Sequence, residues 1–333
     1  MTDDATRHRA AVLPVPAGTP RPLWSVVIPT FNCARYLGET LASVLAQDPG
    51  PGAMQIEVVD DHSSDDPEAV VTKAGGGRVH FFRQPGNVGH TRNFHAGLTR
   101  ARGHLVHLLH GDDYVLPGFY AKLQAAFAAR PDIGAAFCRN YFVDEAGARL
   151  GISDPEQGES GVLKDALERL ALEQRIMTPS IVVGRRVYEA LGAFDERLVC
   201  AEDWEMWVRV AANFPVWYEV EPLAAYRMHA DSNTGRHTSS AEDIRYTRMA
   251  IELFAPYLPP ARAPDITRRA RATYAFAAIR SARTLWDAGD RDGAKAQLRE
   301  SLALSRSWRV LGAALGFAAR SAWPGRGPAR GPA

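Results

Sequence analysis

The stretch Trp24-Ser25-Val26-Val27-Ile28-Pro29 is a short apolar run, rich in β-branched residues and closed by proline. These features predict a buried β-strand. Residues 34–47 follow with apolar side chains spaced for one face of a helix, and strand and helix patterns then alternate to about Asn140. Such alternation is typical of βαβ units with right-handed crossovers. We therefore predict an α/β fold with a mostly parallel central sheet.

Pairs of aspartates follow two of the predicted strands. Asp60-Asp61 end the second strand, and Asp112-Asp113 follow the fourth strand after a glycine. Ligands of parallel sheets bind beyond the carboxyl ends of the strands, so both pairs are expected at one ligand-binding edge. Adjacent carboxylates repel each other, and Mg²⁺ or Mn²⁺ relieves that repulsion. The alternatives are helix capping, which accounts for Ser63–Asp65 but not Asp60-Asp61, and an exposed turn at Asp112-Asp113.

Three further residues are suited to binding or catalysis. Arg92 lies at a predicted helix start after a Gly-rich loop, where N–H groups and a guanidinium suit a phosphate or a base edge. Asp203 opens another predicted helix and can take a proton from a hydroxyl if the chain folds back over the sheet edge. His229 is a candidate for metal or phosphate binding. The structural alternatives are an exposed arginine, a helix cap and a structural histidine.

Composition narrows the class of protein. With 39 Lys+Arg against 38 Asp+Glu, a net charge of +1 gives no general attraction for nucleic acid, so no nucleic-acid partner is expected. The three cysteines are scattered and form no disulfide framework or zinc site, which favours a reducing, cytoplasmic location. Residues 1–22 do not resemble a secretory signal. No window approaches the ~20 apolar residues of a membrane span.

Taken in order, these segments resemble glycosyltransferase family 2, whose catalytic domains have the GT-A fold. The resemblance extends from about Trp24 to Asn233. Each pattern is weak alone, but their joint order and spacing are specific. The matching segments are Val26-Val27-Ile28-Pro29-Thr30-Phe31-Asn32, Val58-Val59-Asp60-Asp61-His62-Ser63, Asn87-Val88-Gly89 with Arg92-Asn93, Leu109-His110-Gly111-Asp112-Asp113, Gly192-Ala193-Phe194-Asp195, and Glu202-Asp203-Trp204 with Arg209.

The resemblance implies an enzyme that transfers a sugar from a UDP-, GDP- or dTDP-sugar to a hydroxyl group and inverts the anomeric centre. It implies Mg²⁺ or Mn²⁺ as the cofactor. The acceptor is expected to be a glycan, a lipid-linked molecule or a small molecule, and cell-surface glycan or polysaccharide biosynthesis is the expected role.

By the family pattern, the donor nucleotide lies at the first half of the domain. The resemblance implies that Asp61 contacts the base, that Pro29 and Phe31 line the base pocket, and that Arg92 lies nearby. Asp112 is expected near the ribose or the sugar.

The remaining roles concern the metal and the acceptor. The resemblance implies that Asp113 binds the metal that bridges the diphosphate, with His229 as a candidate further ligand, and that Asp203 is the general base. Two positions depart from the family pattern. His110 stands where a further aspartate is common, which leaves fewer carboxylates for the metal, and His62 stands where glycine is usual, which loosens the base-pocket geometry.

Two other functions are compatible with parts of the sequence. A nucleotide-sugar-binding scaffold subunit without turnover is supported only by His110. A sugar-phosphate nucleotidyltransferase also uses aspartates on a parallel sheet, but it usually needs a Gly-rich N-terminal loop with a basic residue. Here the first strand ends in Pro29-Thr30-Phe31-Asn32, which argues against that activity.

We expect the chain to divide into four parts. Residues 1–22 are predicted to be a disordered lead and 323–333 a disordered tail. Residues 23–235 are the predicted catalytic domain, with 23–140 as its nucleotide-binding half and 141–235 as its acceptor half, and 240–322 form an all-helical region. The last of these helices contains apolar residues and arginines. We favour packing against the core for it; the alternative is peripheral contact with the inner face of the cell membrane.

Overall fold

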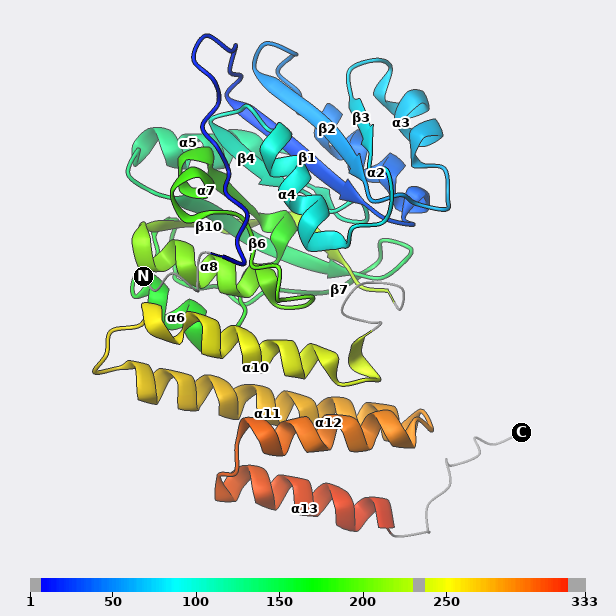
Figure 1. Cartoon of the computed structure of the whole chain (residues 1–333), viewed down its shortest axis with the longest axis vertical. Coiled ribbons are helices and arrows are strands. Elements are labelled where there is room, and N and C mark those ends of the chain that lie inside the picture. The colour runs from blue at the N-terminus through cyan, green and yellow to red at the C-terminus, as the bar shows by residue number, and fades with distance from the viewer. Residues whose placement is uncertain (1–6, 230–236, 323–333) are drawn as a thin grey trace.

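Within the residues described by the computed structural model, 7–229 and 237–322, ten strands form one sheet (Figure 1). The predicted tail and Ser232 and Asn233 lie outside the described residues. The sheet order is β3 (His80–Arg83), β2 (Met54–Asp60), β1 (Trp24–Thr30), β4 (Leu105–Leu108), β9 (Ile181–Gly184), β6 (Ala135–Val143), β10 (Val216–Arg227) and β5 (Tyr114–Val115), with β7 (Arg149–Ile152) paired to β6 and β8 (Gly161–Val162) paired to β10.

The strands of the sheet do not all run in the same direction. β3, β2, β1 and β4 are parallel, as the alternating sequence pattern predicts, and β6 and β10 are parallel to each other. β9 lies between these two groups and is antiparallel to both of its neighbours. The segment 144–161 contributes the edge strand β7. The parallel half places the ends of β1, β2 and β4 at one edge.

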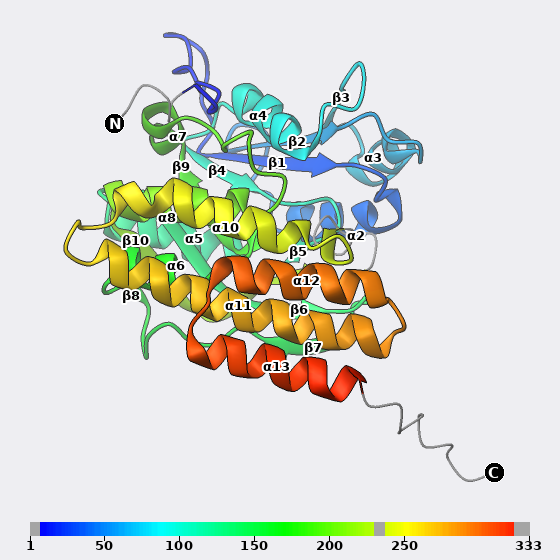
Figure 2. The same ribbon diagram turned by 60° about the horizontal axis from the view of Figure 1, so that its bottom comes forward.

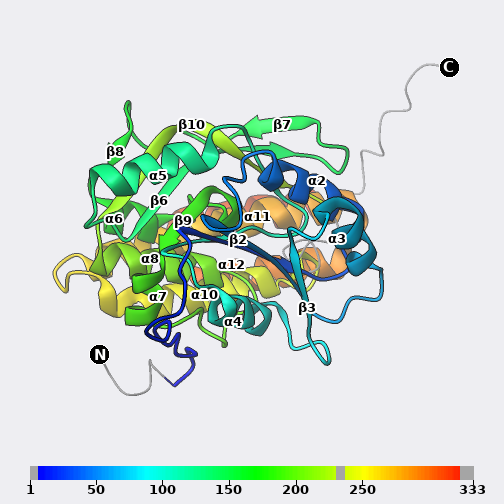
Figure 3. The ribbon, with the colours of Figure 1, turned by 90° about the horizontal axis from the view of Figure 1, so that it is seen from above.

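Helices cover both faces of the sheet, and β1 shows why. All seven of its residues are buried; Val26 and Ile28 enter one apolar core and Val27 enters the other, as the alternation of side chains along a strand requires. Figure 3 shows one helix layer on each side. One layer contains α2 (Ala34–Leu45), α3 (Pro67–Gly75) and α5 (Phe119–Ala129), and the other contains α4 (His90–Arg100), α7 (Arg185–Leu191) and α8 (Glu202–Asn213).

The described part of the lead, residues 7–22, is ordered against the domain, and the prediction of disorder was wrong for it. Arg9 forms a β-bridge with Asp195, and its side chain is 3% exposed. Val12 is buried in the core, and the carbonyl of Leu13 accepts a hydrogen bond from Arg185. The polar, proline-containing composition of residues 7–22 did not predict these contacts, because each contact is made with a residue far along the chain.

The C-terminal helices form the predicted all-α appendage. They stack below the sheet domain, with α13 outermost (Figures 1 and 2). Trp204 of α8 anchors them, since its ring lies 5.0 Å from Phe254 and 4.9 Å from Tyr274. No helix among the described residues has the length and apolar character needed to cross a membrane. The four helices are α10 (Glu242–Phe254), α11 (Ala263–Asp287), α12 (Arg291–Leu304) and α13 (Trp308–Ala322), and α11 also packs on α6 (Ala166–Leu172).

Candidate active site

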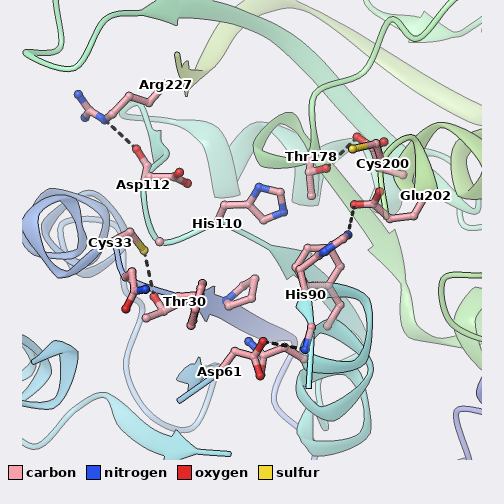
Figure 4. A pocket seen from close by; sticks show the side chains of 18 of the residues that line it. Thr30, Cys33, Asp61, His90, His110, Asp112, Thr178, Cys200, Glu202 and Arg227 are labelled. Carbon is pink, nitrogen blue, oxygen red and sulfur yellow. Dashed lines mark hydrogen bonds and ion pairs between the residues drawn. The ribbon is translucent and has the colours of Figure 1, made fainter. Parts of the chain in front are cut away.

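A cavity of about 340 Å³ lies beyond the carboxyl ends of β1, β2 and β4. Its other wall comes from Gln174, Met177 and Thr178 and from the start of α8. Figure 4 shows Asp112 on one side of the cavity, Thr178 and Glu202 on the other, and His110 between them. Predicted site residues that line the cavity are Pro29, Phe31, Asp61, Asp112, Asp203 and His229.

Asp61 connects the end of β2 to the Gly-rich loop before α4. Its two carboxylate oxygens accept hydrogen bonds from the backbone N–H groups of Val88 (2.7 Å) and Gly89 (3.0 Å). Burial raises the pKa of Asp61, and these two hydrogen bonds oppose the rise. The next residue, His62, has φ of +62°, a left-handed conformation that glycine adopts without strain. The backbone therefore keeps the turn that a glycine favours, although a histidine stands there.

Asp60 has a different task from Asp61. It accepts hydrogen bonds from the backbone and hydroxyl of Ser63 and lies 3.6 Å from the Arg83 guanidinium. Its side chain is fully buried and holds the turn that follows β2. The first acidic pair thus contains one structural and one cavity-lining residue.

The loop after β4 is fixed by neighbours from three directions. The hydroxyl of Thr40 donates to the carbonyl oxygens of Gly111 (3.1 Å) and Asp113 (2.7 Å). A Cβ atom at Gly111 would lie 2.3 Å from the Thr30 hydroxyl, so a larger residue does not fit. Arg227, almost fully buried, donates to the carbonyl of Asp112 at 2.8 Å. This packing holds both aspartates in place.

Asp112 and Asp113 differ in exposure and in charge. Asp112 lines the cavity, and His229 Nε2 donates to its Oδ2 at 2.9 Å. Burial acts to raise the pKa of Asp112, but the hydrogen bond from His229 and the charges of His110 and His229 outweigh it and lower the pKa. Asp113 is 1% exposed, and burial together with the charge of Asp112 raises its pKa well above the usual range. The two neighbouring carboxyl groups therefore differ in how readily they ionise.

A divalent cation fits this pair of residues. Asp113 Oδ1 accepts from the backbone N–H of Arg227 at 2.8 Å, but Asp113 Oδ2 is buried without a hydrogen-bond partner. Ligand atoms of His110, Asp112 and Asp113 all lie within 4.8 Å of one another. Oxygen-rich donor sets with a buried, unsatisfied carboxylate oxygen suit Mg²⁺ or Mn²⁺.

Asp203 lies in the first turn of α8 on the far wall. Its Oδ2 accepts hydrogen bonds from Gln174 Nε2 (2.7 Å) and the Thr178 hydroxyl (3.2 Å). Burial and the charge of the adjacent Glu202 raise the pKa of Asp203 to about 7. A carboxyl group with this pKa is near the optimum for exchanging a proton at neutral pH.

Glu202 connects the two walls through His90. His90 Nε2 lies 3.2 Å from the Glu202 carboxylate (Figure 4). Burial acts to lower the pKa of His90, but the charge and hydrogen bond of Glu202 outweigh it, so the pKa is raised. His90 thereby links the start of α4 to the acids of α8.

Arg92 does not line the cavity, contrary to expectation. Its side chain is 65% exposed and donates to Glu196 at 3.0 Å on the outer surface. His90, the first residue of α4, lines the cavity instead. His229 lies beside Asp112 but is outside the His110–Asp112–Asp113 cluster found among the described residues.

Sequence reasoning also missed residues that shape the site. Gln174 and Thr178, which bind Asp203, come from an irregular segment without a recognisable pattern. His90, Glu202 and Arg227 stand inside motifs that the sequence singled out, but their neighbours were assigned the roles. Their positions next to the residues that were assigned roles are the sequence signal that could have identified these three.

Comparison with known proteins places the sequence in a family. A sequence model described as glycosyl transferase family 2 matches residues 25–190. An uncharacterized glycosyltransferase of Rickettsia typhi is 24% identical over 226 residues, which cover 67% of this chain and 69% of the relative.

Two solved structures share the fold. S. aureus TarS 1–349 in complex with UDP-GlcNAc has a TM-score of 0.59 and 17% identity, with 83% of this chain and 90% of that chain covered. In a longer TarS structure, the match covers 43% of the TarS chain. The mannosyltransferase PcManGT from Pyrobaculum calidifontis, in complex with GDP-Man and Mn²⁺, has a TM-score of 0.54 and 18% identity. The match covers 96% of this chain and 87% of the PcManGT chain.

Proposed function

The chain belongs to glycosyltransferase family 2 and has its GT-A fold, and from that premise we propose that it is an inverting, metal-dependent glycosyltransferase. It transfers a sugar from a nucleotide-diphosphate donor to a hydroxyl acceptor. The observation that carries this proposal is the position of Asp203. A carboxyl group with a pKa of about 7 lines the same cavity as the strand-end residues Asp61 and Asp112, from the other wall.

The donor is proposed to lie along the strand-end wall. Pro29 and Phe31 offer apolar surface to the base, and Phe31 is 38% exposed toward solvent. Asp61 faces the base and Asp112 the ribose or sugar. Structural neighbours were solved with UDP-GlcNAc and with GDP-Man, which supports a nucleotide-sugar donor for this chain.

Asp113 and Asp112 would hold the cation, with Mg²⁺ or Mn²⁺ as the proposed ion. When bound, the cation supplies Lewis-acid stabilisation of the negative charge on the leaving diphosphate. His229 orients the Asp112 carboxylate by its hydrogen bond. Arg227 donates from its side chain to the backbone carbonyl of Asp112 and from its backbone N–H to the carboxylate of Asp113.

Asp203 is proposed to act as the general base. Gln174 and Thr178 hold its Oδ2 by hydrogen bonds, so the carboxylate is oriented before the acceptor arrives. It takes the acceptor proton as the hydroxyl oxygen attacks the anomeric carbon. Attack from the α8 wall and departure toward the strand-end wall place the two groups on opposite sides of that carbon, which corresponds to a single displacement with inversion.

A donor screen tests the proposal. Titration calorimetry with UDP-, GDP- and dTDP-sugars, with and without Mn²⁺, should give metal-dependent binding of at least one donor by the wild-type chain. The Asp113→Asn variant should lose the metal dependence. If every donor fails to bind with Mn²⁺ present, the proposal is contradicted; donor binding without transfer to any glycan, lipid-linked or small-molecule acceptor would favour a scaffold subunit.

The cellular setting is proposed from two features. Cys33, Cys138 and Cys200 are buried and are not joined in disulfides, which supports a reducing, cytoplasmic location. A role in cell-surface glycan or polysaccharide synthesis is proposed by the family resemblance.

The last helix is proposed to contact an anionic membrane from the cytoplasmic side. One face of α13 packs inward through Val310, Ala314 and Phe317, as favoured from the sequence. Its outer face exposes Trp308 (77%) and Leu315 (70%). The sequence from 301 to 333 contains five arginines and no acidic residue. Such positive charge attracts anionic lipid and opposes pairing of this face with a second copy.

Vesicle sedimentation tests this contact. Wild-type protein should sediment with phosphatidylglycerol vesicles and not with phosphatidylcholine vesicles, and Trp308→Ser with Leu315→Ser should abolish binding. Leu150→Ser, at an exposed apolar residue of β7, is the matched control and should bind as wild type does. Equal binding by the double variant would contradict the proposal, and a loss of self-association in that variant would identify a second copy as the partner.

A further inference from the structure

His110 lines the cavity between Asp112 on one side and Thr178 and Glu202 on the other (Figure 4). Its ring stacks on Phe94, with centroids 5.2 Å apart and an angle of 21° between the planes. This stacking fixes the plane of the imidazole. One face is therefore covered, and only the ring nitrogens are left for polar contacts.

Neither ring nitrogen of His110 has a good hydrogen-bond partner among the described residues. Nε2 is buried without a partner, and Nδ1 lies 3.7 Å from Asp113 Oδ2, which is too long for a hydrogen bond. Asp113 Oδ2 is itself buried and unpartnered. Buried polar atoms normally have partners because leaving them unpaired costs free energy. The unsatisfied Asp113 Oδ2 and the ring nitrogen Nδ1 of His110, 3.7 Å apart, point to a ligand between or beside them.

Resting on the proposed function, we infer that His110 is a nitrogen ligand of the cation that Asp112 and Asp113 hold. Ligand atoms of these three residues already lie within 4.8 Å of one another. The histidine thus replaces a carboxylate ligand by a nitrogen ligand at this position.

The second histidine nearby has a different role. His229 Nε2 is already bound to Asp112 Oδ2 at 2.9 Å. A histidine that donates to a metal-binding carboxylate orients that carboxylate, as residues around metal sites commonly do. The structure therefore assigns ligation to His110 and orientation to His229.

A mixed nitrogen and oxygen site changes the choice of metal. Mg²⁺ strongly prefers oxygen ligands, whereas imidazole suits transition metals, and Mn²⁺ accepts both. We expect the wild-type chain to prefer Mn²⁺ over Mg²⁺ and the His110→Asp variant to lose part of this preference, by ~10-fold in the ratio of dissociation constants.

Pulsed electron paramagnetic resonance of bound Mn²⁺ tests the inference without measuring activity. Mn²⁺ is added alone and together with UDP or GDP. The wild-type spectrum should show modulation from a directly bound nitrogen, and its frequencies should change in protein labelled with ¹⁵N-histidine. The signal should persist in His229→Gln and disappear in His110→Asp, while Mn²⁺ still binds to both variants.

The outcomes separate this inference from the proposed function. If Mn²⁺ binds but the wild-type spectrum has no nitrogen modulation, or if the modulation persists in His110→Asp, His110 is not a ligand although the metal site stands. If wild-type protein binds no Mn²⁺ with UDP or GDP present, the metal-dependent function itself is overturned. The ¹⁵N-histidine experiment on wild type, together with His229→Gln, decides the question even if His110→Asp does not fold.

Discussion

Two groups of buried acidic side chains in the catalytic domain are neutralised in different ways. In the first group, which we call the Arg9 network, Asp195 and Glu205 are fully buried. Arg9 approaches both, at 3.5 Å and 3.2 Å, and each has a further arginine: Arg197 at 2.7 Å for Asp195 and Arg209 at 2.9 Å for Glu205. Burial acts to raise the pKa of Asp195, but the arginines outweigh it and lower the pKa.

The second group lines or underlies the cavity, and no arginine side chain in the described part of the chain pairs with its members Asp203 and Asp113. Their partners are an amide, hydroxyl and backbone groups, and burial raises the pKa of both. A buried charge is costly unless it is paired. The comparison teaches that acids with arginine partners maintain the fold, whereas acids without them are available to a proton or a cation.

The largest effect is expected from Asp203→Asn. The asparagine keeps the shape of the side chain but cannot accept the acceptor proton, so turnover should fall by ~10³-fold. Donor affinity should stay within ~2-fold, because the donor lies along the other wall. Steady-state rates and titration calorimetry measure the two quantities. Full activity in this variant would show that the unpaired acid of α8 is not the base.

Arg9→Ala tests the other side of the comparison. It removes one partner from each of two buried carboxylates, and we expect it to reduce the free energy of unfolding by ~3 kcal/mol. Urea denaturation measures this loss, and Arg92→Ala serves as an exposed control with little change. Turnover per folded molecule should be unaffected. A large loss of turnover at unchanged stability would place the Arg9 network in the catalytic machinery.

The pH dependence of turnover sharpens the comparison further. Asp203 acts as a base only when ionised, so turnover should rise with pH through about 7 and then level off. Glu202→Gln removes the neighbouring negative charge that raises this pKa. The midpoint should therefore move to lower pH in the variant. An unchanged midpoint would show that the limiting ionisation belongs to another group.

The sequence was sufficient for much of the fold because periodicity reports local burial. The strands at 24–30 and 54–60 and the helices of the C-terminal region are close to their predicted ranges. The sequence was also sufficient to predict that the pairs Asp60-Asp61 and Asp112-Asp113 lie at the ends of strands. It did not reveal that β9 inserts antiparallel between two parallel groups, or that Arg9 reaches Asp195, since both depend on contacts between distant segments.

Helix phase explains one error in the predicted site. α4 begins at His90, and His90 lines the cavity. Arg92 follows two positions later, which corresponds to a rotation of about 200° around the helix axis. A guanidinium at that phase faces solvent, although the residue type and its place in the motif were suited to binding. A sequence pattern predicts the first residue of a helix only to within one or two positions, and a shift of one position changes which side chains face the cavity.

The smallest effect is therefore expected from Arg92→Ala. Its guanidinium is 65% exposed and pairs with Glu196 on the outer surface, where solvent screens the interaction. Donor affinity, measured by calorimetry with the donor identified in the screen, should change by less than ~2-fold, and stability by less than ~0.5 kcal/mol. A tenfold loss of donor affinity would mean that the guanidinium leaves Glu196 and reaches the donor. The cavity acids would then have an arginine partner in the donor complex, and the contrast with the Arg9 network would hold only for the free protein.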